Sequence, residues 1–399
     1  MRRAIGNTAL ICGGAAVILA MIAMLWMMLP SDKSNAGIST DLTIGTYGEN
    51  VYLYSFDHQS LEFTLKSKGT SENPSYALSS RNDRNKIFTY AVRESGNHSG
   101  AVSLLSRSSL MSRDKVTSLK MTADQAETGA DPCFLMLYDD GKYLFTADYS
   151  GGTISVFPIE EGVIGDRIDQ LEFEGSGPVK GRQESSHMHQ IRQIPSTEDF
   201  GNQWLLASDL GCDVLRLIFV SRIDSYANGE SIMPVHIQDF PCPSGSGPRH
   251  MEFSKDGRTL YCIAELSGEI LVYDIHGKNG QPILELKQRI QADEVNAGGS
   301  ADIHLHPSGK WLYTSHRLDN DGIATFSVGE GGELKKIGYT RTARHPRNFM
   351  ITDDGAYLLA ACRDDRLIQV FSIDEKGGLT LTPSVLEFDS DRPSSILAY

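Results

Sequence analysis

Three features of the sequence predict an all-β fold. A unit of short strands recurs along the chain, and successive copies begin about 45 to 60 residues apart. Within each unit, apolar and polar residues alternate over runs that are typical of β-strands. The 38 glycines and 15 prolines are spread over the whole chain, which indicates many turns. A strand-rich repeat of this length is typical of β-propeller blades.

Six copies of the unit are complete. Each begins with a strand that often follows Pro, continues through a turn of Asp-Gly or Ser-Gly type, and ends in two further strands. The copies start at Asn73, Asp131, Ser186, Gly247, Ser300 and His345. A seventh copy is divided between the ends of the chain, because "LTIGTYGENVYLYSFD" lacks a first strand and "RPSSILAY" resembles one. We therefore predict a seven-bladed β-propeller that is closed by strands from both termini.

The N-terminal segment differs from the rest of the chain. Two arginines follow the first Met, and "TALICGGAAVILAMIAMLWMMLP" is then apolar over about the 20 residues that a bilayer core requires. This length favours an uncleaved anchor, and "SNA" at 34–36 leaves a cleaved signal peptide open. We expect an exported protein, periplasmic or at the cell surface. The expected parts are a membrane anchor or signal segment at 1–30, a linker at 31–40 and the propeller at 41–399.

Charge and cysteine content exclude several classes of protein. The formal net charge is −14, and no long run of basic residues offers a face for nucleic acid. Five cysteines lie outside the N-terminal segment, and their odd number and spacing fit neither a disulfide framework nor a zinc site. We expect them to be small buried residues. They are Cys133, Cys212, Cys242, Cys262 and Cys362.

Charged residues recur at two positions of the repeat. In a propeller blade, the start of the first strand and the end of the second strand lie at the same mouth of the central channel. First strands open near Tyr76, Phe134, His189, Arg249, Asp302 and Arg347, and second strands end in Glu94, Asp148, Asp209, Glu265, Arg317 and Arg363. The pattern predicts a site for a small anionic molecule at this mouth. Its expected substrate-binding residues are Asp148, Asp209, Asp302 and Arg347.

Two pairs of histidines have the spacing of metal ligands. His187 with His189, and His304 with His306, would each point to one side of a strand, and Asp302 could add a carboxylate. The turn after His306 argues against the second pair. We expect neither a metal nor another cofactor.

Several stretches resemble a known family, and the likeness covers about residues 41 to 399. The stretches include "TADYSGGTISVFPI", "SHMHQIRQIP", "GPRHMEFSKDG" and "GSADIHLHPSGKWLYTSHR". In their order and spacing they resemble the seven-bladed β-propeller lactonases, which include bacterial 6-phosphogluconolactonase and the fungal carboxy-cis,cis-muconate cyclase. The resemblance implies a catalytic set of one His, two Arg and one Glu, which corresponds here to His189, Arg249, Glu265 and Arg317.

Lactone hydrolysis needs a base to activate water, donors for an oxyanion and an acid for the leaving alkoxide. Either His189 or Glu265 could take the proton, Arg249 could stabilise the oxyanion, and Arg317 could bind a carboxylate or phosphate. The expected substrate is a sugar-acid lactone, although an exported location does not suit a cytosolic sugar phosphate. A ring-forming cyclase and a non-enzymatic binding module of the cell envelope remain alternatives.

Overall fold

The structure is a computed structural model that describes residues 37–82, 86–96, 100–106, 117–118, 120–225 and 229–399. The predicted anchor or signal segment at 1–30 lies outside the described residues, as does most of the predicted linker. Ser39–Tyr399 forms one compact unit. The described part of the chain contains no helix with the length and hydrophobicity needed to cross a bilayer. Its helical content is one 3-10 turn, η1 (Leu318–Asn320).

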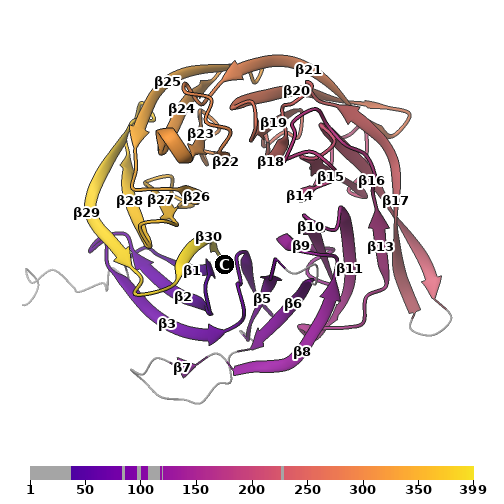
Figure 1. Ribbon diagram of the computed structural model, residues 1–399, viewed down its shortest axis with the longest axis horizontal. Helices are drawn as coiled ribbons and strands as arrows, with labels where there is room; N and C mark the ends of the chain where they lie inside the picture. Colours follow the sequence, from indigo (N-terminus) through magenta and orange to yellow (C-terminus); the bar gives the residue numbers. More distant parts are fainter. Residues whose placement is uncertain (1–36, 83–85, 97–99, 107–116, 119, 226–228) are drawn as a thin grey trace, which may run out of the picture. The chain divides into compact units, whose positions relative to one another are not determined.

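Seven sheets, antiparallel except for the short pairing of β3 with β7, are arranged radially about a central axis, which confirms the predicted seven-bladed propeller (Figure 1). Each blade has one innermost strand at the axis. These strands are β4 (Ala77–Arg81), β9 (Pro132–Tyr138), β14 (Met188–Gln193), β18 (Pro248–Phe253), β22 (Ser300–Leu305), β26 (Pro346–Ile351) and β30 (Arg392–Ala398). They begin within a few residues of the predicted repeat starts, because the Pro and turn signals that mark each repeat precede them directly.

The second strands include the most buried segments of the propeller. All six residues of several second strands are buried, since neighbouring blades pack on both faces of the sheet. Second strands are β1 (Ser39–Tyr47), β5 (Ile87–Glu94), β10 (Tyr143–Asp148), β15 (Trp204–Asp209), β19 (Thr259–Ala264), β23 (Trp311–His316) and β27 (Tyr357–Cys362). Third strands are β2 (Asn50–Asp57), β6 (Gly100–Ser106), β11 (Thr153–Glu160), β16 (Val214–Ser225), β20 (Glu269–Lys278), β24 (Gly322–Val328) and β28 (Leu367–Ile373).

Each blade also has a fourth, outermost strand that the predicted three-strand unit lacks. These strands are β3 (Phe63–Thr70), β8 (Lys120–Thr128), β13 (Asp169–Glu172), β17 (Gly229–Pro241), β21 (Gln281–Gln291), β25 (Leu334–Arg341) and β29 (Leu379–Glu387). Short strands β7 (Thr117–Ser118) and β12 (Val163–Ile164) pair with β3 and β11. An outermost strand is largely exposed, as the pattern of β29 shows, so its sequence carries a weak apolar signal.

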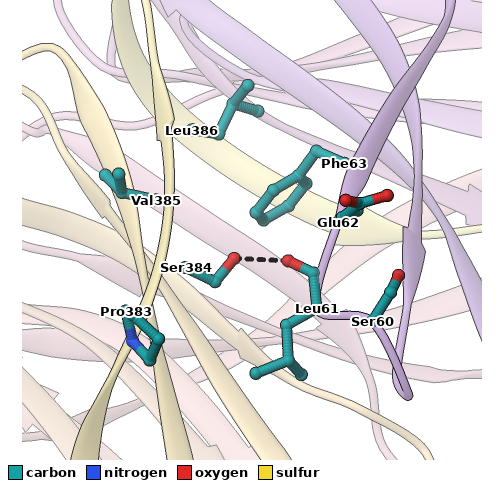
Figure 2. Close-up of a pocket in the computed structure, with 8 residues that line it drawn as sticks. All are labelled: Ser60, Leu61, Glu62, Phe63, Pro383, Ser384, Val385 and Leu386. Atoms are coloured by element: carbon teal, nitrogen blue, oxygen red, sulfur yellow. Dashed lines mark hydrogen bonds between the residues drawn. The ribbon is translucent and has the colours of Figure 1, made fainter.

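Strands from the two ends of the described chain close the ring, as predicted. β30 is the innermost strand of the seventh blade and pairs with β1 in an antiparallel register that sets Leu42 opposite Ala398 and Ile44 opposite Ile396. Figure 1 shows yellow β30 beside indigo β1. At the outer side, Pro383–Leu386 of β29 and 60–63 line a groove, in which the Ser384 hydroxyl donates to the carbonyl oxygen of Leu61 (Figure 2). These contacts join the seventh blade to the sixth.

The turn between the first and second strands needs glycine in most blades. Gly141, Gly257, Gly309 and Gly355 all have φ between +69° and +82°, in the region that favours glycine. The predicted Asp-Gly and Ser-Gly turns are therefore confirmed at these positions. They return the second strand to the mouth at which the first strand began.

Candidate active site

Several innermost strands have a β-bulge at their second residue. In β18, pairing with β19 shifts register between Pro248 and His250, so Arg249 has no partner in the ladder. The same irregularity lies at His189 in β14 and at Arg347 in β26. A bulge re-aims the side chain of its extra residue. The side chains of these three predicted site residues therefore do not follow the alternation of the sheet, and they lie beside the ends of the second strands.

Glu265, which directly follows β19, is the centre of the resulting cluster. Its Oε2 lies 2.7 Å from Arg249 Nε and 3.2 Å from Arg317 Nη2. Its Oε1 lies 2.6 Å from Arg182 Nη2. Burial raises the pKa of this carboxyl, but Arg317, Arg249 and Arg182 outweigh burial and lower the pKa to about 2. Glu265 is therefore ionised at every physiological pH and is a weak base.

Arg182 is a member of the cluster that the sequence did not predict. It comes from the long connection between β13 and β14, outside the strand positions on which the prediction rested. Gln183 holds this connection, because its amide nitrogen donates to Leu210 O and to Asp213 Oδ1, both at 2.8 Å. The Arg182 side chain is 38% exposed and covers the solvent-facing side of the Glu265 carboxylate, which is otherwise buried.

The cluster holds more positive than negative charge. Burial lowers the pKa of Arg249, as does the charge of Arg347, and Glu265 opposes both only in part. The pKa of Arg317 falls to about 9 for the same reasons, with burial first. Both arginine residues are buried, with at most 5% of their surface exposed. One carboxylate thus compensates several cations, and the cluster favours an additional anion.

His189 is buried next to this cluster without a carboxylate partner among the described residues. Its Nδ1 lies 3.8 Å from the Cys133 sulfur, and its ring meets the rings of Tyr149 and His250 edge to face at 5.6 and 5.1 Å. Burial, followed by the charge of Arg249, holds the pKa of His189 well below its usual value. The imidazole is therefore neutral at pH 7 and can accept a proton.

A second cationic group lies on the sixth blade, where Arg347 contacts Tyr47 of the closing blade. Arg347 Nη2 donates to Tyr47 Oη at 2.8 Å, and the Tyr47 hydroxyl donates to the carboxylate of Glu94 at 2.8 Å. The guanidinium of Arg347 also lies over the Tyr47 ring, 5.1 Å from its centroid. Tyr47 was not predicted as a site residue, because a single Tyr at the end of a strand carries no distinctive signal. It fixes the direction of the Arg347 side chain.

Asp148 and Asp209 lie at the predicted strand ends but are enclosed by their own turns. Asp148 accepts hydrogen bonds from three hydroxyls and one backbone N–H. Asp209 pairs with Arg216 at 2.6 Å and accepts from the Ser186 hydroxyl and three backbone N–H groups. Both are fully buried. Their oxygens are occupied within the protein.

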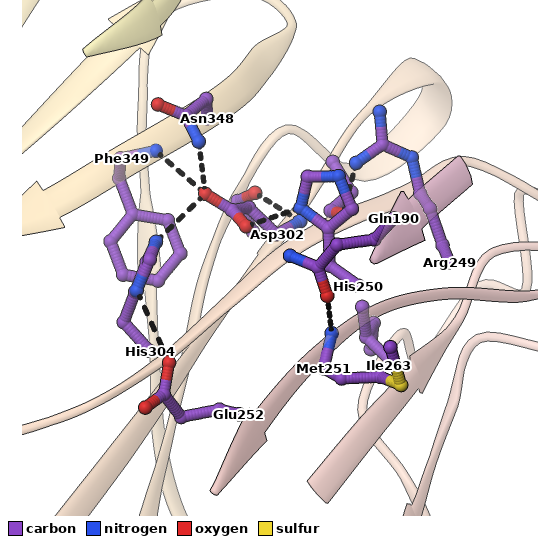
Figure 3. A network of polar contacts seen from close by, with 12 residues as sticks. Gln190, Arg249, His250, Met251, Glu252, Ile263, Asp302, His304, Asn348 and Phe349 are labelled. Atoms are coloured by element: carbon purple, nitrogen blue, oxygen red, sulfur yellow. Dashed lines mark hydrogen bonds and ion pairs between the residues drawn. The ribbon is translucent and has the colours of Figure 1, made fainter. Parts of the chain in front are cut away.

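Asp302 lies deeper in the channel than the arginine cluster. Its carboxylate accepts from His250 Nδ1 at 2.7 Å, from His304 Nε2 at 3.0 Å and from the side-chain amide of Asn348 (Figure 3). The backbone N–H of Phe349 is a fourth donor at 3.3 Å. Asp302 therefore links three blades and has no free oxygen toward the arginines.

The two histidine pairs have separate partners. His187 stacks on Tyr149 at 4.4 Å, and His306 contacts the Gly355 carbonyl and the Ser308 hydroxyl. His304 is held between Asp302 and Glu252. Among the described residues, the structure shows no group of three His, Cys, Asp or Glu side chains arranged for a metal ion.

Comparisons with known proteins agree with the fold. Residues 41–398 match the family model described as lactonase, 7-bladed beta-propeller. A 6-phosphogluconolactonase of Formosa agariphila is 31% identical over 367 residues, which cover 88% of this chain and 96% of that protein.

Two solved structures extend the comparison. A crystal structure of a Bacteroides fragilis protein has a TM-score of 0.80 and 35% identity, covering 92% of this chain and 100% of that one. The Pseudomonas aeruginosa periplasmic gluconolactonase has a TM-score of 0.73 and 26% identity, covering 90% and 99%. The chain belongs to the seven-bladed β-propeller lactonase family and is a lactone-hydrolysing enzyme.

Proposed function

We propose that the enzyme hydrolyses an anionic sugar-acid lactone, of the 6-phosphogluconolactone type, at the channel mouth formed by Arg182, Arg249, Glu265 and Arg317. The observation that carries this proposal is the excess of buried guanidinium groups over the single carboxylate of Glu265. A phosphate or carboxylate on the substrate supplies the missing negative charge, and Arg binds such groups with its planar fork. The name of the Formosa agariphila relative supports the substrate class.

The proposed roles follow from burial and charge. His189 takes a proton from water because it is neutral and buried beside the cluster. The water oxygen then bonds to the lactone carbonyl carbon, and Arg249 stabilises the oxyanion that forms. The ring C–O bond breaks, and the leaving oxygen receives the proton from His189. Glu265 orients the arginines rather than acting as a base, since its pKa is about 2.

Arg317 and Arg347 are proposed to bind the anionic group of the substrate from two sides of the mouth. Arg347 is only partly buried, and Tyr47 holds its guanidinium in place. For Asp148, Asp209 and Asp302 we propose structural roles instead of the expected substrate contacts, because their oxygens already accept hydrogen bonds within the protein.

We also propose that the enzyme works outside the cytoplasm, held at its N-terminus by an anchor or exported by a signal segment. The apolar N-terminal sequence after two arginines supports this location. The similar Pseudomonas aeruginosa gluconolactonase is described as periplasmic.

The substrate proposal is tested with the full-length enzyme. Acid release from 6-phosphogluconolactone, gluconolactone, an anionic muconate-type lactone and a neutral aliphatic lactone is followed by pH-stat beside the spontaneous rate. We expect turnover to be fastest with an anionic sugar-acid lactone. A preference for the neutral aliphatic lactone would contradict the proposal. Net ring closure of the open-chain muconate that corresponds to the muconate-type lactone would indicate a cyclase.

A further inference from the structure

A layer of side chains crosses the channel below the arginine cluster. The Tyr76 and Phe134 rings pack at 4.5 Å, and Phe134 meets the His250 ring at 5.7 Å. Asp302 joins His250 to Asn348, whose Oδ1 accepts from the backbone N–H of the closing strand β30. We call Tyr76, Phe134, His250, Asp302 and Asn348 the septum. All five are at least 91% buried.

Beyond the septum lies a cavity of about 510 Å³, here called the far chamber. The septum residues line its inner end, and its lining continues to Gln193, Ile351 and Ala398, the last residues of β14, β26 and β30. The arginine cluster lies at the beginnings of the innermost strands, so the far chamber opens at the opposite end of the channel. Its volume falls within the range of about 300–1,000 Å³ that is typical of small-molecule pockets.

One wall of the far chamber presents hydrogen-bond donors. Gln190 accepts from Met251 N–H through its Oε1 at 2.6 Å, and its amide nitrogen has no partner among the described residues. Figure 3 shows this nitrogen on the side of His304 and Asp302. Arg192 uses Nη1 for Met251 O and Glu252, whereas its Nε and Nη2 donate to none of the described residues.

The cations of this wall are more exposed than the carboxylates that balance them. Side-chain exposure is 31% for Arg192 and 32% for His304, against 17% for Glu252 and 2% for Asp302. Burial lowers the pKa of His304, but Asp302 and Glu252 outweigh burial and raise the pKa to about 10. His304 is therefore charged at neutral pH. A ligand in the chamber therefore contacts the hydrogen-bond donors and positive charge of Arg192 and His304 more readily than the carboxylates of Glu252 and Asp302, which already have partners.

The other wall is apolar. Leu78, Met136, Met350 and Leu397 line it, together with the rings of Tyr76 and Phe134 from the septum. An apolar surface of this kind accommodates a hydrocarbon chain or ring and offers no partner to additional polar groups. The chamber is thus divided into a donor-rich wall and an apolar wall.

We propose that the far chamber is a second ligand site, which takes a small carboxylic acid with an apolar body. The carboxylate accepts hydrogen bonds from the free donors of Arg192 and Gln190, near the charge of His304, and the apolar body packs against the opposite wall. The septum separates this site from the arginine cluster, so the two sites bind their ligands independently.

The test measures binding of 4-fluorobenzoate to the full-length protein by ¹⁹F NMR, with 4-fluorobenzyl alcohol as the neutral probe of similar shape. We expect the acid to bind at least ten-fold more tightly than the alcohol. Arg192→Met keeps the aliphatic stem and removes the donors, and should weaken binding of the acid at least ten-fold. Leu397→Trp, which fills the apolar side while Arg192 stays in place, should weaken it as well.

Arg317→Met, in the arginine cluster, is the matched control and should leave binding in the far chamber unchanged. Thermal unfolding verifies that each variant is folded. Loss of binding in Arg317→Met with retention in Arg192→Met would place the acid at the other mouth and overturn the proposal. Equal affinity for acid and alcohol, or no binding at millimolar concentration, would also overturn it. Benzoate binding requires no hydrolysis, so this result is separate from the outcome of the lactonase assay.

Discussion

Replacing Glu265 by Gln removes the one negative charge at the centre of three arginines and keeps the size of the side chain. The pKa of Glu265 is about 2 in the folded protein, against an ordinary value of 4.5. At about 1.4 kcal/mol per pH unit, the folded structure favours the ionised carboxylate by about 3 kcal/mol. The carboxylate is buried, so this interaction is only weakly screened by solvent. We expect the substitution to lower the free energy of unfolding by about 3 kcal/mol.

Urea-induced unfolding followed by circular dichroism measures this loss. Glu294→Gln is the matched control, because Glu294 pairs with Lys336 at 2.8 Å but is 66% exposed, and such pairs contribute about 1 kcal/mol or less. The contribution of Glu265 to stability is present above pH 4.5 and is lost as pH falls toward 2. The free energies of unfolding of the two variants should therefore converge in acid. Equal destabilisation by both substitutions at pH 7 would refute the assigned role of Glu265.

Three further results are expected. Arg317→Met should raise KM for an anionic lactone at least ten-fold and change KM for a neutral lactone little, and equal effects on both would contradict its role in anion binding. Tyr47→Phe frees Arg347 from its hydroxyl partner and should raise KM several-fold with kcat nearly unchanged, in the same pH-stat assay. The melting temperature should peak near pH 6.5 to 7. His250, with a pKa of about 4, takes up a proton on unfolding below pH 6.5, and His304, with a pKa of about 10, releases one above it. A melting temperature that still rises above pH 8 would contradict this assignment.

Much of the fold could be predicted because the propeller repeats its local signals. The glycine turns and the apolar second strands recur at the same positions of each blade, and both follow from local chemistry. The blade that is divided between the two ends of the chain was also predictable. The C-terminal segment resembles a single first strand, and the N-terminal copy lacks its first strand, so together they make one complete blade. The outermost strands were missed, because strands such as β29 and β21 bury too few residues to show a clear pattern.

The candidate site was only partly predictable. Arg249 and Glu265 were placed together by strand direction alone, and the structure brings them to 2.7 Å. Arg182 was missed because it reaches the site from a connection whose path depends on tertiary contacts. Asp302 was expected beside the arginines, but the sequence does not show the register shift between Ser300 and Ile303, and the carboxylate lies in the septum.

The most direct test of the central claim compares kcat/KM for 6-phosphogluconolactone between the wild-type enzyme and two arginine variants. Arg249→Ala removes the proposed oxyanion donor, and its kcat/KM should fall about 10² to 10³-fold, mostly through kcat. Arg289→Ala, which removes a 51% exposed side chain paired with Glu269, should stay within two-fold of the wild type. Unchanged turnover in a folded Arg249→Ala variant would show that lactone hydrolysis does not take place at this cluster.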